Sequence, residues 1–247
     1  GIDHPSGKGV AREGLTRGGS VTLTMMRPAA VCIVTCMAIA CTCAQPVPLT
    51  EDEARAWLDH AVPLPREVQL TGALAVPAGS VRVVSPDDAT PVTQSAVDEL
   101  FGAVGELRGS PRASIRLLLG GARAAPLRDL PSSEQAYLIT PRVDGRELQV
   151  VALEPPGLYY GALTLTQLIA GRTSGGTIHL PVVTITDWPD MPDRGLWGSD
   201  TFLEVEWMAR RKLNLIEQIS TLQVAPDGRA DAGLKPGREP MVDLAPR

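Results

Sequence analysis

The sequence predicts an α+β fold in which a mixed, mostly antiparallel sheet carries two helices on one face. Short runs of apolar and β-branched residues alternate with polar ones, as they do in half-buried strands. Two longer segments repeat their apolar residues at three- and four-residue steps, as helices that cover a sheet do. Asp144-Gly145 lies between two strand-like runs and indicates a hairpin, which pairs its strands antiparallel. A sheet with its helices on one face satisfies all three observations.

The first half of this domain is expected to contain three strands and one helix. Residues 67–74 and 81–84 have the pattern of strands, and the turn-forming residues "PAGS" separate them. Residues 93–107 are expected to form a helix because apolar side chains recur along one side, namely Val97, Leu100, Phe101, Val104 and Leu107. Residues 114–119 form the next strand, which Gly120-Gly121 ends without the lysine and helix start of a phosphate-binding loop.

The second half is expected to add three strands and another helix. Residues 136–140 and 147–153 flank the hairpin turn, and the two prolines of "LEPPG" stop the second strand. The helix that follows has an apolar face made of Leu158, Ala162, Leu165, Leu168 and Ile169. Gly171 is expected to cap this helix, and residues 177–186 form the last strand.

Beyond the segment "DWPDMPD" we expect a strand, a helix and a second strand, at residues 194–197, 203–213 and 214–219. The helix has acidic residues in its first turn and basic residues in its last, which suits the helix dipole. These charged residues are Glu204, Glu206, Arg210, Arg211 and Lys212. A strand, a helix and a strand are the opening unit of an α/β fold. Residues 221–247 are rich in Pro, Gly, Asp and Arg without periodicity, so we expect an irregular tail there.

The composition argues against two kinds of site. A net charge of −5 and an aromatic content of 4% give no sign of a nucleic-acid-binding protein, whose usual footprint is a basic face with stacking side chains. All four cysteines lie in the short apolar stretch near the N-terminus, at Cys32, Cys36, Cys41 and Cys43. The rest of the chain can therefore hold no disulfide framework, zinc–thiolate site or cysteine nucleophile. No metal ion or other cofactor is expected.

The N-terminal region has the pattern of a secretory signal. Residues 25–44 begin with Met25-Met26, carry one positive charge and continue with an apolar run that is too short to span a membrane. Cleavage is expected after Ala44, and lipidation at Cys41 is the alternative. Residues 1–24 precede this signal and are expected to be a tail or the result of a start codon placed too early. The protein is thus expected to be secreted or periplasmic, with no membrane span.

Two segments resemble a known family. "EQAYLITPRVDGRELQVVALEPPGLYYGALTLTQLIAG" and "LPVVTITDWPDMPDRGLWG" are similar to the N-terminal accessory domain of the family 20 glycoside hydrolases, the β-N-acetylhexosaminidases. The matching positions are Tyr137, Gly157, Tyr160, Gly161, Thr164, Leu165, Gln167, Leu168, Ile185, Asp187, Pro189, Arg194 and Gly195. Ile139 stands where the family has Leu. "WMARRKLNLIEQ" resembles the first helix and second strand of the family's catalytic barrel, with Lys212 and Asn214 in place.

The resemblance covers roughly residues 63–215 and implies two domains. Residues 49–190 would form the accessory domain, and residues 193–220 would be the incomplete start of a TIM-type barrel. Full-length enzymes of the family remove a terminal N-acetylhexosamine by substrate-assisted, retaining hydrolysis. That reaction needs an adjacent Asp-Glu pair, and none occurs after Arg194.

We therefore expect an inactive N-terminal fragment whose full-length parent acts on an amino-sugar glycan. Family 84 glycosidases and α-glucuronidases, which have related accessory domains, remain alternative parents. A different alternative is a standalone, non-catalytic interaction domain.

The resemblance implies one substrate-binding residue, Arg194, and no catalytic residue in this chain. The matching arginine in the family hydrogen-bonds sugar hydroxyls, and a guanidinium suits such vicinal oxygens. An ion pair between Arg194 and Asp187 or Asp193 is the alternative interpretation. Where the family has an Asp shortly after this position the chain has Ser199, so Asp200 is either a displaced sugar ligand or a helix N-cap. Trp188 and Trp197 could stack on a sugar, and the alternative for Trp188 is packing at the seam between the domains. Glu217 is expected to be a surface or salt-bridged carboxylate, with a place at the barrel mouth as the alternative. Four other residues are expected to be structural or exposed: His60, Tyr159, Tyr160 and His179.

Overall fold

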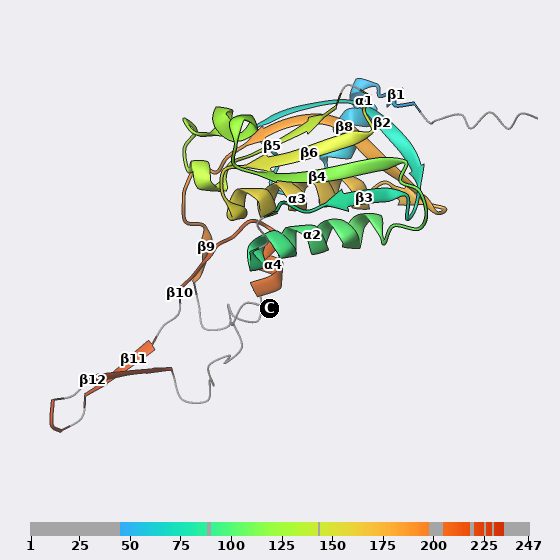
Figure 1. Ribbon diagram of the computed structural model, residues 1–247. Coiled ribbons are helices and arrows are strands. Elements are labelled where there is room, and N and C mark those ends of the chain that lie inside the picture. Colours follow the sequence, from blue (N-terminus) through green and yellow to red (C-terminus); the bar gives the residue numbers. More distant parts are fainter. Residues whose placement is uncertain are drawn as a thin grey trace, which may run out of the picture. The chain divides into compact units, whose positions relative to one another are not determined.

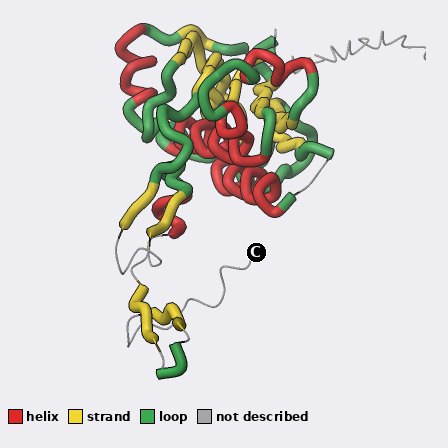
Figure 2. Tube along the Cα trace, turned by 90° about the vertical axis from the view of Figure 1, so that its left-hand side faces the viewer, coloured by secondary structure: helices red, strands yellow, loops and turns green. Residues whose placement is uncertain are grey.

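The computed structural model describes residues 45–87, 90–142, 144–197, 205–217, 220–224, 226–228 and 230–234 (Figures 1 and 2). The chain divides into two compact units, residues 1–41 and 42–247, and every described residue belongs to the second. The expected signal peptide at residues 25–44 and the segment before it lie outside the described residues. No helix among the described residues is long and apolar enough to cross a membrane.

A mixed, mostly antiparallel sheet forms the centre of the domain, as the sequence predicts. Its strands run in the order β1-β2-β8-β5-β6-β4-β3, and β7 pairs with β8 (Figure 1). Among the described strands of this sheet, the pairs β3–β4 and β4–β6 are parallel and the others are antiparallel. The strands are β1 (Val47–Pro48), β2 (Glu67–Pro77), β3 (Val81–Val84), β4 (Ala113–Leu119), β5 (Tyr137–Pro141), β6 (Glu147–Ala152), β7 (Thr173–Ser174) and β8 (Thr177–Asp187).

The hairpin expected around Asp144-Gly145 is present between β5 and β6. Gly145 has a φ of 66°, which glycine adopts without strain, and Asp144 accepts a hydrogen bond from the backbone of Arg146. The turn is longer than two residues, because β5 ends at Pro141 and β6 begins at Glu147. The turn between β2 and β3 is also where we expected it, but these two strands do not pair with each other.

Two helices pack side by side on one face of the sheet, as predicted (Figure 1). α2 (Pro91–Val104) begins two residues before its expected start, because Thr90 caps it and Pro91 suits the first helical position. α3 (Pro155–Ala170) likewise begins with the prolines that end β6, and Gly171 caps it. The core lies between these helices and the sheet, and its fully buried side chains include Leu100, Ile115, Leu117, Ile139, Val150, Leu158 and Leu165.

A third helix, α1 (Glu51–Leu58), has no counterpart in the sequence prediction. The Thr50 hydroxyl accepts a hydrogen bond from the amide of Glu53, whose carboxylate accepts one from the amide of Thr50. Trp57 is the buried residue of this helix, and its indole donates to the carbonyl of Leu168 on α3 at 2.5 Å. One buried residue makes no apolar stripe, so periodicity could not reveal the helix.

The segment after β4 contains two short 3₁₀ helices, η1 (Ala122–Leu127) and η2 (Ser133–Gln135). Beyond β8 come β9 (Gly195–Trp197), α4 (Val205–Ala209) and β10 (Leu215–Glu217), and the two strands pair in parallel. α4 ends four residues before the expected Leu213, because Lys212 adopts a left-handed conformation with a φ of 59°. The expected first turn, with Glu204, lies partly outside the described residues.

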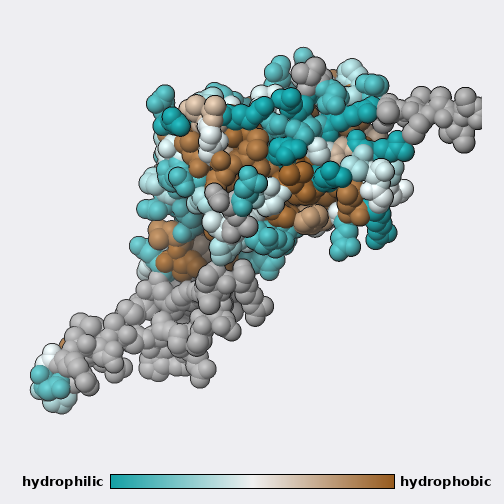
Figure 3. All heavy atoms as spheres, viewed as in Figure 1, coloured by the Kyte–Doolittle hydropathy of each residue, from teal (hydrophilic) through white to brown (hydrophobic). Residues whose placement is uncertain are grey.

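We expected an irregular tail from residue 221, and this prediction is wrong for part of that segment. β11 (Ser220–Val224) and β12 (Ala230–Leu234) pair antiparallel in a hairpin. The turn includes Asp227-Gly228, a hairpin signal that the Pro- and Arg-rich composition concealed. In the β9–β10 unit, Trp197 is 70% exposed and Leu215 39% exposed, and Figure 3 shows hydrophobic atoms where Figure 1 places these strands.

Candidate functional site

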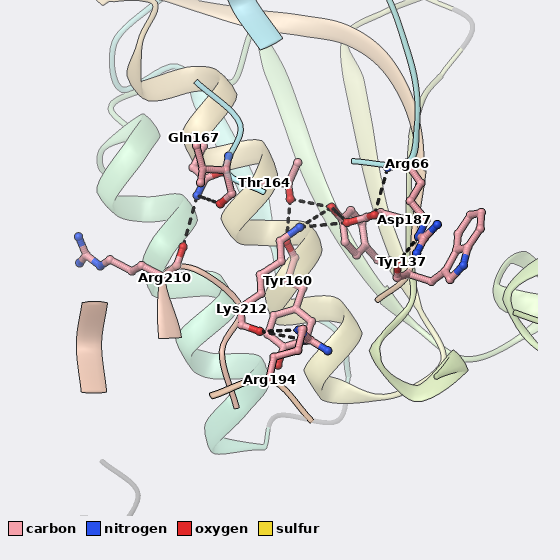
Figure 4. A network of polar contacts seen from close by, with 11 residues as sticks. Arg66, Tyr137, Tyr160, Thr164, Gln167, Asp187, Arg194, Arg210 and Lys212 are labelled. Atoms are coloured by element: carbon pink, nitrogen blue, oxygen red, sulfur yellow. Dashed lines mark hydrogen bonds and ion pairs between the residues drawn. The ribbon is translucent and has the colours of Figure 1, made fainter. Parts of the chain in front are cut away.

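A buried polar cluster joins the end of the sheet to the segment that follows it (Figure 4). The ammonium of Lys212 lies 3.1 Å from Oδ2 of Asp187 and donates a hydrogen bond to the Tyr137 hydroxyl at 2.8 Å. The Tyr137 hydroxyl donates to the same carboxylate oxygen at 2.7 Å. The Thr164 hydroxyl lies 2.7 Å from the Tyr137 hydroxyl. Lys212 is only 4% exposed and Asp187 8% exposed, so both charges are almost wholly removed from water.

Each member of this cluster is placed by a feature of the local fold. Tyr137 begins β5 and Asp187 ends β8, and the two residues are directly opposite each other in the antiparallel pair. Gly161 on α3 lets the Tyr137 ring lie against the helix, because a Cβ there would be 3.0 Å from the ring. The left-handed conformation of Lys212 turns the chain after α4. Figure 4 shows its side chain reaching the carboxylate from the segment beyond the sheet.

Burial controls the protonation of this cluster. Burial lowers the pKa of Lys212, and the Asp187 carboxylate beside it opposes that shift. Burial also raises the pKa of Tyr137 well above its usual value, and the negative charge of Asp187 adds to the effect. The Tyr137 hydroxyl therefore stays protonated and can act as a hydrogen-bond donor to Asp187. The ion pair between Lys212 and Asp187, with its hydrogen bonds to Tyr137, joins the end of β8 to the turn before β10.

Arg194 binds backbone carbonyls and makes neither of the ion pairs considered for it. Its Nε and Nη2 donate to the carbonyl of Lys212 at 3.2 and 2.8 Å, and its Nη1 donates to that of Met191 at 2.6 Å. The guanidinium also lies 5.6 Å from the centre of the Tyr160 ring. The partner of Asp187 is Lys212. Arg194 thus ties the start of β9 to the residues just before β10.

Further contacts attach the same segment to the domain. The Gln167 side chain on α3 bonds both backbone groups of Val62 and donates to the carbonyl of Arg210 at 3.3 Å (Figure 4). Asn214 accepts from the amide of Arg194 at 2.8 Å and donates to the carbonyl of Pro192 at 2.8 Å. Arg194 and Asn214 therefore close the segment on itself, while Gln167 fastens it to α3.

A hollow of about 340 Å³ lies beside the cluster. Its lining includes Arg66, Gln135, Tyr160, Asp187, Trp188, Arg194 and Lys212. Arg66 lies 5.0 Å from the centre of the Trp188 ring and forms an ion pair with Asp190. The Gln135 side-chain oxygen is buried and has no partner among the described residues, so it could accept one further hydrogen bond.

The model of one protein family covers most of this domain. The family described as "Glycosyl hydrolase family 20, domain 2" matches residues 60–188, more than half of the 247 residues. The chain belongs to glycosyl hydrolase family 20. The match begins in the loop before β2 and ends one residue beyond Asp187, so it includes Tyr137, Thr164 and Asp187.

Solved structures of family 20 enzymes are similar to this chain over part of their length. One is an N-acetyl-β-hexosaminidase from Streptomyces plicatus in complex with thio-NAglucal (22% identity, TM-score 0.49, covering 70% of this chain and 35% of that one). Another is an exo-β-N-acetylglucosaminidase from Vibrio harveyi in complex with N-acetylglucosamine (19% identity, TM-score 0.49, covering 71% of this chain and 26% of that one). The chain thus spans about a quarter to a third of these proteins. A search of curated proteins found no match.

In this family 20 chain, the candidate residues lie in different places. Arg194, Tyr160 and Trp188 all line the hollow beside the cluster. Asp200 and Ser199 lie outside the described residues. Glu217 ends β10, and Trp197 ends β9 with most of its surface exposed. His179 lines a different hollow and the ring of His60 packs against Gly171, so the structure does not bring these two residues to the cluster.

The sequence did not identify Lys212 and Asp187 as partners. They are 25 residues apart and belong to segments expected to form different domains. Both were noted as matching the family 20 pattern, but a match does not say which side chains meet. The sequence placed Lys212 in the last turn of the expected helix at residues 203–213, and a solvated cation that suits the helix dipole is the usual meaning of that pattern.

Proposed function

We propose that the chain is the N-terminal portion of a secreted glycosidase resembling the β-N-acetylhexosaminidases. Residues 49–190 form its accessory domain, and residues 193–220 begin its catalytic barrel. The observation that supports this best is the parallel pairing of β9 with β10 across α4, directly after the family 20 domain. Parallel neighbours joined through a helix are the repeating unit of a TIM-type barrel.

The Lys212 cluster serves as the attachment between the two domains. Tyr137, Thr164 and Asp187 come from the accessory domain, whereas Lys212 comes from the turn that leads into the second barrel strand. β9 and β10 both start at this end of the unit, so the attachment lies at the N-terminal ends of the barrel strands. TIM barrels carry out their chemistry at the opposite face, which leaves this face available for docking.

The full-length enzyme would remove a terminal N-acetylhexosamine with the sugar's own acetamido oxygen as nucleophile. That reaction needs an adjacent Asp-Glu pair, and the residues after Arg194 contain none. The 247-residue chain is therefore inactive by itself. Arg194 remains our candidate for a sugar ligand of the complete barrel, but it precedes β9 at the N-terminal end of the strands, so its side chain would have to extend through the barrel interior toward the opposite face. To act as one, its guanidinium must exchange a carbonyl that it now binds for a sugar hydroxyl.

An activity assay on two forms of the protein tests this function. The 247-residue chain and the product of its whole gene are incubated with 4-methylumbelliferyl N-acetyl-β-D-glucosaminide. We expect the whole product to release the fluorophore and the shorter chain to release none. In the cells that produce the protein, the activity should appear in the exported fraction, with a mature protein that begins at Gln45 or at a lipid-modified Cys41. Hydrolysis by the 247-residue chain, or none by the whole product, would contradict the proposal.

A further inference from the structure

Arginines gather on the face of the sheet opposite α2 and α3. Along β4, Ile115 and Leu117 point into the core, so Arg116 between them points to the other face. Gln149 on β6 is directly beside Arg116 in the parallel pair. Six arginines occur on and around this part of the sheet, from β3 to the β5–β6 turn: Arg82, Arg112, Arg116, Arg123, Arg142 and Arg146.

These arginines line one elongated trough. A hollow of about 660 Å³ has Arg116, Arg123 and Arg142 in its walls, and one of about 280 Å³ has Arg82, Arg112 and Arg146. Both hollows include Arg116, Asp144 and Glu147 in their walls, so they adjoin each other, and we call the two together the trough. The shape fits a chain-like ligand better than a single small ion, because the positive charges are spread along its whole length.

The charge of the trough is strongly positive although the chain is acidic. Six arginines face two carboxylates there, in a protein with a net charge of −5. Glu147 is already engaged: Gln149 and Ser114 donate to it at 2.7 and 3.2 Å, and Arg116 lies 3.6 Å away. These contacts lower the pKa of Glu147, with the Gln149 hydrogen bond as the largest cause. Arg82 and Arg142 make no side-chain hydrogen bond or ion pair with a described residue.

We propose that this trough binds an acidic polysaccharide, whose sugar rings carry carboxylate or sulfate groups. Guanidinium groups match such anions with paired N–H donors. The Asp144 carboxylate and the Ser114 hydroxyl would accept hydrogen bonds from the neutral sugar hydroxyls between the charged groups. No aromatic side chain lines the trough on which a base could stack.

Fluorescence anisotropy tests this with the 247-residue chain and four labelled probes. The probes are a heparin dodecasaccharide, a hyaluronan decasaccharide, uncharged chitohexaose and a short DNA duplex. We expect the chain to bind at least one of the two acidic oligosaccharides, more weakly as salt is added, and to bind chitohexaose and DNA less tightly. The Arg116→Gln, Arg142→Gln double variant should weaken that binding by about a hundredfold or more, since it removes charge-assisted hydrogen bonds at two positions.

A matched control separates the trough from net charge. The Arg55→Gln, Arg211→Gln double variant removes two arginines elsewhere on the surface and should bind nearly as the parent does. Melting temperatures show whether each variant is folded, and the Arg116→Lys, Arg142→Lys pair keeps the charge while removing the planar donors. Three results would overturn the proposal: no binding of either acidic probe, equal weakening in both Gln variants, or tighter binding of DNA. None of them depends on the glycosidase activity.

Discussion

At the scale of single residues, the most informative feature is a charge pair that water cannot reach. Lys212 and Asp187 lose most of their hydration, and the neutral Tyr137 hydroxyl accepts a hydrogen bond from Lys212 and donates one to Asp187. A pair of this kind adds little stability compared with apolar side chains, but removal of one partner leaves the other buried without compensation. The pair is therefore expected to decide which arrangement of the two segments is stable.

The substitution Asp187→Asn tests this expectation. It leaves the Lys212 ammonium without its counter-charge, so we expect the free energy of unfolding to fall by about 3 kcal/mol. The value is an upper limit, because the segment that carries Lys212 can detach and return the ammonium to water. Asp190→Asn is the control: its ion pair with Arg66 is mostly exposed and should change stability by less than about 1 kcal/mol. Urea denaturation measures both, and equal effects would show that the buried pair has no special role.

At the scale of elements, helix α3 approaches the sheet so closely that it needs glycine. A Cβ on Gly157 would lie 2.3 Å from the carbonyl oxygen of Ala136, and one on Gly161 would lie 2.6 Å from a methyl group of Val150. Both glycines belong to the family pattern seen in the sequence. The same close packing places Thr164 against Tyr137, so the helix positions one side of the buried cluster.

Two alanine substitutions in helices should therefore change the free energy of unfolding in opposite directions. Gly157→Ala pushes α3 away from a backbone carbonyl that cannot move aside, and we expect a loss of about 1–3 kcal/mol. Gly102→Ala on α2 meets nothing within 4 Å and should stabilise the protein by about 0.5–1 kcal/mol, because alanine is the better helix former. Thermal denaturation of the two variants measures the difference. If both substitutions stabilise the protein, α3 does not pack as closely against the sheet as the structure indicates.

At the scale of the whole molecule, folding keeps all three tyrosine hydroxyls protonated at a higher pH than in the unfolded chain. The sequence has three, Tyr137, Tyr159 and Tyr160, and burial raises the pKa of each, to about 12 for Tyr159. Above the ordinary pKa of 10.0 the unfolded chain releases these protons while the native chain keeps them. Stability should therefore be fully present below pH 10 and be lost as pH rises toward 12.

Lys212 acts in the opposite direction, because a lowered lysine pKa makes stability rise with pH up to its ordinary value of 10.5. One lysine is outnumbered by three tyrosines, so the protein as a whole should lose stability as pH rises from 10 toward 12. Absorbance near 295 nm should show clearly less tyrosinate in the native protein at pH 10 than in urea, where about half of the tyrosines are ionised. A native titration centred on pH 10 would contradict the burial of these rings.

The sequence predicted much of the accessory domain because the information was local. Six of its strands and two of its helices follow from periodicity, from residues that end strands and from the Asp144-Gly145 turn. α1 was missed because Trp57 alone is buried on it, and the β11–β12 hairpin was missed because composition outweighed its turn signal. The Lys212 cluster and the arginine trough could not be predicted, since both depend on which strands become neighbours. Residues 25–44, 199 and 200 stay predictions, because they lie outside the described residues.

The central claim is that β9, α4 and β10 begin a catalytic barrel attached to a family 20 accessory domain. The most direct measurement is the sequence of the coding DNA beyond the Arg247 codon. The account predicts that the reading frame continues for about 200 residues, the remainder of a barrel, with an adjacent Asp-Glu pair at the end of a predicted strand. A stop codon directly after Arg247 would contradict it and would leave the chain as an interaction domain without glycosidase activity.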